Sequence, residues 1–136
     1  MYKRYLMSFF NKGGEILSEE IPQQLQHQLM RLQQIDQQVK VLTQQRTQLE
    51  LQLRETENAL KELESAEEDV GVYKSIGMLL IKSDMKKLKE ELIDKKETLD
   101  MRIKTLQRQE ERSKKQRDEM REKLARQIQG EPGTAA

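Results

Sequence analysis

The sequence contains no cysteine and no tryptophan, and aromatic residues make up only 4% of its 136 positions. The absence of cysteine excludes disulfides and thiolate metal sites. No stretch approaches the roughly 18 apolar residues that are needed to span a bilayer. A compact domain of this length normally supplies more large apolar side chains to its core. We therefore expect a soluble, cytoplasmic protein that is mainly α-helical and lacks a globular core.

Charged residues make up 36% of the chain, yet the net charge is only +1 because both signs are interspersed. No strong overall field is expected to attract nucleic acid or an acidic membrane. The short basic run at 113–117 is bracketed by acidic residues and has no interleaved aromatics. The single histidine, His27, lies among glutamines, and Gly13-Gly14 lacks the residues of a phosphate loop. The sequence therefore predicts no enzyme activity, no cofactor or metal, and neither a nucleic-acid nor a membrane partner.

A sustained heptad repeat predicts a first long helix, from about Pro22 to about Glu67. Pro22 suits the first helical position because its missing N–H would be unpaired there. Steps of three and four residues from Leu25 give twelve positions, nine of them apolar, and we call this stripe the first seam. The first seam consists of Leu25, Gln28, Leu32, Ile35, Val39, Leu42, Arg46, Leu49, Leu53, Thr56, Leu60 and Leu63.

A second helix is predicted to open after Ser83 and Asp84, either of which can cap it. Its end is expected near Gly130, because glycine favours helix C-termini. The second seam is apolar at first and then becomes polar before two apolar residues close it. It consists of Leu88, Leu92, Leu99, Ile103, Leu106, Glu110, Ser113, Arg117, Met120 and Leu124.

The two predicted helices have similar lengths, each roughly 65–70 Å at 1.5 Å per residue. Equal helices joined by a short connection favour a long antiparallel coiled-coil hairpin, with both chain ends at its far end. The alternative is one continuous helix in a parallel dimer. Gly71, Gly77 and the β-rich run that follows Gly71 argue against it.

The run "VYKSIGMLLIK", residues 72–82, predicts one short β-hairpin within about 70–83. Gly77 and Met78 form a two-residue loop, and glycine in the first position suits a type II′ turn. Counting outward from this loop pairs residues 76, 75, 74 and 73 with 79, 80, 81 and 82. A lone apolar ribbon is marginal in water, and its open edges invite another chain. We expect an assembly role for Val72, Tyr73, Ile76, Gly77, Leu79, Leu80 and Ile81.

Apolar residues also gather where the first helix begins and the second ends. Leu29 and Met30 lie off the first seam, so we expect both to be at least partly exposed. Flexible methionine and leucine side chains suit contact with many partners. Alternatively, these residues only close the coiled coil. The candidate binding residues at these helix ends, or tips, are Ile21, Leu25, Leu29, Met30, Leu32, Met120, Leu124 and Ile128.

The hairpin segment, the opening "IPQQLQHQL" and the stretch "KKETLDMRIKTLQRQEER" together resemble the beta subunits of the prefoldin family, of the archaeal type. The resemblance covers about residues 19–129, and the "VYK…G…LIK" segment is its specific part. A single hairpin implies the beta class, since alpha subunits carry two. The resemblance further implies a hexamer of two alpha and four beta subunits, in which the hairpin strands join a β-barrel platform.

The resemblance also implies a function, namely an ATP-independent chaperone, or holdase. Its coiled-coil tips would bind unfolded client proteins and deliver them to a group II chaperonin. The alternative is a structural coiled-coil adaptor or scaffold whose hairpin merely dimerises it. Suppression of client aggregation distinguishes the two, since an adaptor has no reason to show it.

The ends of the chain lie outside the resemblance. We interpret residues 1–18 as an N-terminal extension that is misannotated or disordered, and 130–136 as a disordered tail. The codons of 13–15 can form a ribosome-binding sequence ahead of Leu17, so we hypothesise that 1–16 precede the true start. Alternatively, the aromatic residues of 1–10 form an amphipathic extension that touches a membrane or a partner.

Overall fold

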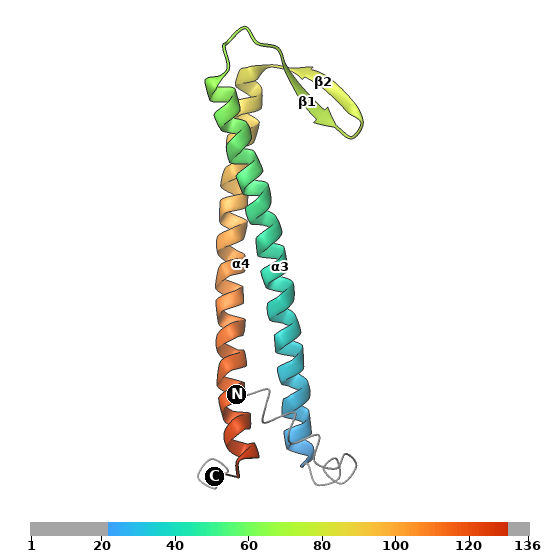
Figure 1. Cartoon of the computed structure of the whole chain (residues 1–136), viewed down its shortest axis with the longest axis vertical. Helices are drawn as coiled ribbons and strands as arrows, with labels where there is room; N and C mark the ends of the chain where they lie inside the picture. The colour runs from blue at the N-terminus through green and yellow to red at the C-terminus, as the bar shows by residue number, and fades with distance from the viewer. Residues whose placement is uncertain (1–21, 131–136) are drawn as a thin grey trace. The chain divides into compact units, whose positions relative to one another are not determined.

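The computed structural model describes residues 22–130 and contains two helices and two strands (Figure 1). Helix α3 spans Gln23–Ser65, strand β1 spans Val72–Ile76, strand β2 spans Leu79–Ser83, and helix α4 spans Met85–Ile128. This order confirms the predicted mainly α fold with one β-hairpin between two long helices. Neither helix is long and apolar enough to cross a membrane. The interpretations of 1–18, of Ile21 and of 131–136 fall outside the described residues.

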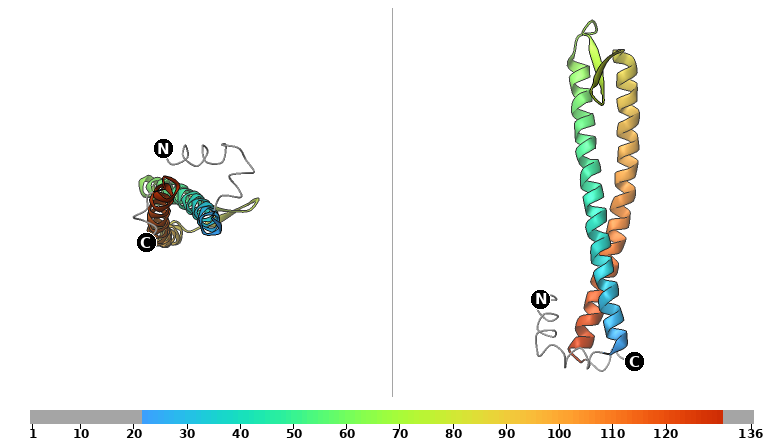
Figure 2. Two further views of the ribbon diagram at one scale, coloured as in Figure 1. Left: turned by 90° about the horizontal axis from the view of Figure 1, so that it is seen from below. Right: turned by 90° about the vertical axis from the view of Figure 1, so that its right-hand side faces the viewer.

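The chain divides into two compact units. The terminal unit comprises Met1–Leu42 and Gln109–Ala136, of which 22–42 and 109–130 are described. The hairpin unit comprises Thr43–Arg108 and so includes both strands. In the terminal unit, the start of α3 and the end of α4 lie side by side in both Figure 1 and Figure 2.

The predicted seams are the faces that α3 and α4 bury. Every position of the first seam is buried or half-buried, including the polar Thr56. Its hydroxyl donates to the carbonyl of Gln52 at 2.8 Å, so burial leaves that donor satisfied. The second seam is likewise buried or half-buried from Leu88 to Leu124. The heptad repeat therefore predicted correctly which side chains pack between the helices.

The ends of the helices follow their local chemistry. The Asp84 carboxylate accepts from the backbone N–H of Lys86 at 3.3 Å, so Asp84 rather than Ser83 caps α4. Gly130, with a φ of 75°, follows the end of α4 as predicted. Helix α3 starts one residue after Pro22, whose carbonyl accepts from the N–H of Gln26 at 3.1 Å.

Strands β1 and β2 pair antiparallel in the predicted register. Ile76 lies opposite Leu79 and Tyr73 opposite Lys82, and a further pair joins Val72 to Ser83. Gly77 has a φ of 58°, whereas Met78 has no positive φ. A positive φ at the first loop position alone is the pattern of a type II′ turn, and type I′ would need it at both. The predicted turn is thus confirmed.

Replacing Gly77 with Ala should weaken strand pairing by about 1–2 kcal/mol, the cost of a left-handed φ for a residue with a Cβ. A Cβ there meets nothing within 4 Å, so the cost is conformational rather than steric. Cross-strand NMR contacts between Lys74 and Ile81 should fall, while helical circular dichroism remains. Gly71→Ala is the matched control, since its Cβ would make only an ordinary contact, at 3.7 Å, with the Tyr73 ring. Equal losses in both variants would contradict this account of the turn.

Candidate functional site

A small apolar cluster closes the terminal unit. Its buried members, and the partly buried residues packed on them, come from the first turns of α3 and the last turns of α4. Only Leu32 and Leu124 are almost completely buried. It consists of Leu25, Leu29, Leu32 and Leu124, with Met120 and Ile128 against them.

One expectation about this cluster is wrong and another is confirmed. Leu29, expected to be partly exposed, is only 8% exposed. It lies four residues after Leu25 and three before Leu32, so all three share one face of α3 and pack together. Met30 is 62% exposed, as expected. Met30 is therefore the candidate tip residue of α3 that a partner reaches without any rearrangement.

A shallow groove of about 280 Å³ lies on the surface of the terminal unit. Ile35 and Met120 supply its apolar part, while cationic and anionic side chains both stand along it. Such a surface suits apolar contact without a strong preference for the charge of the partner. The lining residues are Gln28, Arg31, Ile35, Gln116, Glu119, Met120 and Lys123.

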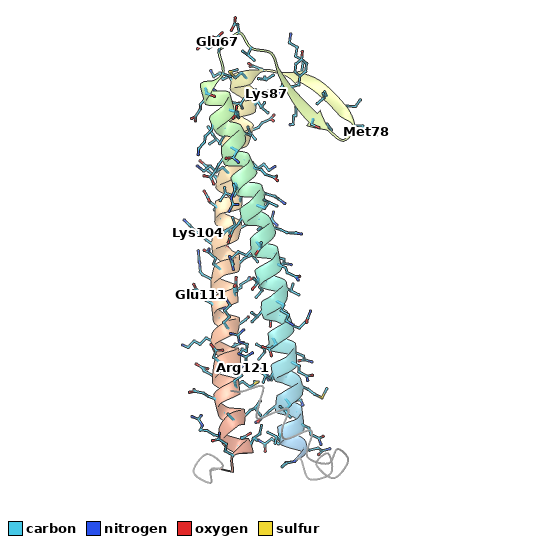
Figure 3. All side chains as sticks on the ribbon, viewed as in Figure 1. Glu67, Met78, Lys87, Lys104, Glu111 and Arg121 are labelled. Carbon is cyan, nitrogen blue, oxygen red and sulfur yellow. The ribbon has the colours of Figure 1, made fainter. Side chains whose placement is uncertain are left out.

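An ionic layer lies beside the apolar cluster inside the terminal unit. Nη2 of Arg121 donates to the carboxylate of Asp36 at 3.2 Å, and Nε of Arg117 lies 4.0 Å from the same oxygen. These contacts join α3 to α4 in antiparallel register, and Figure 3 labels Arg121 on α4. The sequence analysis missed Asp36. The sequence did carry a signal for this contact, since Asp36 is an acidic residue beside the first seam and Arg117 is an arginine on the second seam.

The polar stretch of the second seam is also buried, and its carboxylate is paired. Glu110 is 3% exposed and Ser113 is 6% exposed. The Glu110 carboxylate accepts from Nζ of Lys114 at 2.8 Å, one turn further along α4. Buried polar groups need such partners, because an unpaired one is costly. This stretch therefore contributes less apolar burial than the positions of the hairpin unit that Leu49, Leu99 and Ile103 fill.

The β-hairpin presents apolar side chains that the described chain leaves uncovered. Leu80 is 75% exposed and Met78 is fully exposed at the free end of the ribbon, where Figure 3 labels it. Val72, at the base, is half-buried. The other large apolar side chains of this surface, all about half exposed or more, are Val70, Tyr73, Ile76, Leu79 and Ile81. We call Val70, Tyr73, Ile76 and Met78 to Ile81 the hairpin surface.

One ion pair joins the hairpin to α4. Nζ of Lys74 donates to the Glu91 carboxylate at 2.9 Å, with both side chains partly exposed. An exposed pair of this kind contributes about 0–1 kcal/mol. The apolar side chains of the hairpin therefore have more to gain from a partner than from their own chain.

The residues that the structure describes, 22–130, contain no cluster of metal-ligating side chains. No three His, Cys, Asp or Glu side chains of that range are placed to hold a metal ion. His27 is exposed on α3, as the sequence indicated. What the described surfaces do offer is apolar contact.

The fold and sequence were compared with known proteins. A family model described as "Prefoldin subunit" matches residues 26–131. The prefoldin subunit beta of Archaeoglobus fulgidus is 44% identical over 77% of this chain and 90% of its own length. That of Methanothrix thermoacetophila is 42% identical over 79% of this chain and 90% of its own. The crystal structure of the prefoldin beta subunit from Thermococcus strain KS-1 matches with a TM-score of 0.68 and 38% identity, covering 80% of this chain and 92% of that one.

These similarities extend over both helices and the hairpin, so they concern the fold as a whole. Prefoldin subunits are chaperone subunits, and they form hetero-oligomers with other prefoldin subunits. An uncovered hairpin surface is what a subunit of such an assembly would show in isolation. The chain belongs to the prefoldin subunit family and groups with its beta subunits.

Proposed function

We propose that the chain is a holdase subunit that binds unfolded proteins at the end of its terminal unit, without ATP, and passes them to a group II chaperonin. The observations that carry the proposal are the small apolar cluster of the terminal unit and the exposure of Met30 on the same part of α3. The cytoplasmic location expected from the sequence is part of this proposal.

Client binding would use burial of apolar surface, worth roughly 25 cal/mol per Å². Met30 is accessible already, and the half-buried Met120 and Ile128 expose further apolar surface on α4. Leu25, Leu29, Leu32 and Leu124 become available only if the two helices separate. Because apolar contact is non-directional, many unrelated unfolded chains satisfy it. This accounts for holding without sequence specificity.

The hairpin surface would provide assembly. Its strands expose unpaired backbone groups along both outer edges, which another strand can complete. In the proposed hexamer of two alpha and four beta subunits, the strands contribute to a shared β-barrel platform. Several client-binding ends on one platform raise the effective local concentration, so weak individual contacts sum to useful holding.

Met30→Ser should weaken client holding without affecting assembly. Loss of the buried area of one methionine costs about 1 kcal/mol or more, so client affinity should fall on the order of fivefold. The readout is the aggregation of guanidinium-unfolded citrate synthase, with the oligomer mass checked by light scattering. Met101→Ser is the matched control, because Met101 is 71% exposed on α4 in the hairpin unit. Undiminished protection by an assembled Met30 variant would move the client site elsewhere.

Ile76→Asp combined with Leu80→Asp should disrupt assembly with a prefoldin alpha subunit, because it places charge where strands would pack. Helical circular dichroism should persist, since the seams are unchanged. Ile93→Asp is the control, as Ile93 is about as exposed as Ile76 but lies on α4. An unchanged oligomer mass for the double variant would refute the assembly role of the hairpin. If the protein were instead a structural adaptor, the double variant would still lose assembly, but even the wild type would give no protection in the citrate synthase assay.

A further inference from the structure

The proposed client site is largely closed in this structure, so the contacts around it set how readily it opens. Three leucines of α3 pack against Leu124 of α4 and are at most 8% exposed. Beside this cluster, and beside the buried Ile35 that continues the seam, ionic contacts join the same segments, from Asp36 to Arg117 and Arg121. These ion pairs therefore add to the apolar contacts that hold the two segments together.

Both arginines have a second acceptor on their own helix. Nε of Arg117 lies 3.2 Å from the Asp118 carboxylate, and Nη1 of Arg121 lies 3.9 Å from it. Asp118 is mostly exposed, whereas Asp36 is half-buried. If α3 moves away, the arginines lose Asp36 but keep Asp118. Opening therefore leaves neither guanidinium without an anion, and it avoids the large cost of orphaning a buried charge.

A buried side-chain amide also favours separation of the two helix segments. The side-chain oxygen of Gln28 is buried without a hydrogen-bond partner among the described residues. A buried acceptor in that condition costs about 1–3 kcal/mol, which hydration on opening would recover. Gln28 lies on the first seam between Leu25 and Leu32, both members of the apolar cluster, so this cost falls beside their contacts.

We propose that Asp36 and Asp118 compete for Arg117 and Arg121, and that this competition sets how often the apolar cluster opens to an extended apolar segment of a client. Pairing with Asp36 holds the helices together, and pairing with Asp118 allows them to part. This inference rests on the proposed client site and adds its regulation. The ligand class is an unfolded chain whose apolar side chains replace the leucine contacts between the helices.

The ion pairs predict how salt acts. In the closed state each arginine is shared between Asp36 and Asp118, whereas in the open state both arginines are left with Asp118 alone. Salt screens exposed and half-exposed charges, with a Debye length of about 10 Å at 0.1 M and about 3 Å at 1 M. Raising the salt concentration should therefore increase opening of the wild-type cluster. Purely apolar closure predicts no such increase.

Hydrogen exchange of the amides at 25–32 reports on opening, because turns of α3 that lose their packing against α4 unfold more readily. In the full chain assembled with a prefoldin alpha subunit, Asp36→Asn should accelerate this exchange roughly two- to fivefold, the range expected for one partly exposed ion pair. Asp118→Asn should slow it, because the arginines then have only Asp36. Between 0.05 and 0.5 M NaCl, exchange should accelerate in the wild type and stay flat in the Asp36 variant.

Glu50→Gln is the matched control, since it removes the pair with Arg46 inside α3 and crosses to no other helix. Client holding is measured in parallel with guanidinium-unfolded citrate synthase, and it should rise in Asp36→Asn and fall in Asp118→Asn. If exchange shifts in opposite directions in the two variants while client holding stays unchanged, the competition between Asp36 and Asp118 is upheld and the client site is rejected. If exchange is unchanged in both variants, or shifts in the same direction in both, the proposed competition is overturned whatever the client-holding assay shows. If the Asp36→Asn variant lost its helical circular dichroism, the direction of the exchange shift in Asp118→Asn would still decide whether the proposal holds.

Discussion

When two helices pack together, each buries only one strip of its surface, and this geometric constraint governs the rest of the molecule. The strip has to supply the apolar burial that a globular core would otherwise provide, so its composition sets local stability position by position. Where leucine and isoleucine fill it, as at Leu49, Leu99 and Ile103, the helices have a continuous apolar contact. Where Glu110 and Ser113 fill it, polar groups take that place and need partners. Stability is consequently uneven along the same pair of helices.

The β-hairpin follows from the same constraint. A two-helix strip has no further apolar face to offer, so side chains of β1 and β2 remain on the surface. A two-stranded ribbon is marginal by itself, which makes its exposed leucines and isoleucines a liability unless another subunit covers them. The chain belongs to a family whose subunits form hetero-oligomers, and in the proposed assembly a neighbouring subunit would cover these side chains. Weak anchoring by Lys74 and Glu91 is consistent with a hairpin that is stabilised mainly by its partners.

Local rules were sufficient to predict most of the fold. The seams follow from a period of 3.5 residues, and the strand register follows from the position of Gly77 in a two-residue loop. The exposure of Leu29 was predicted wrongly, because a single stripe of 3–4 steps is narrower than the face that α3 buries near its start. The ionic layer was missed for a different reason. Asp36 and Arg121 are separated by 85 positions, so their contact depends on the antiparallel register and not on any neighbouring residue.

A chaperone subunit that binds by apolar contact has two opposing requirements. It must expose enough leucine and methionine surface to attract an unfolded chain, and it must hide that surface when no client is present, since exposed patches associate with each other. An entirely apolar strip would satisfy the second requirement by making separation costly at every turn. An ionic layer next to a small cluster satisfies both, because the charge-pair energy is modest and Asp118 accepts the arginines once Asp36 departs. The placement of polar residues on the second seam is therefore as informative about function as the leucines between which they stand.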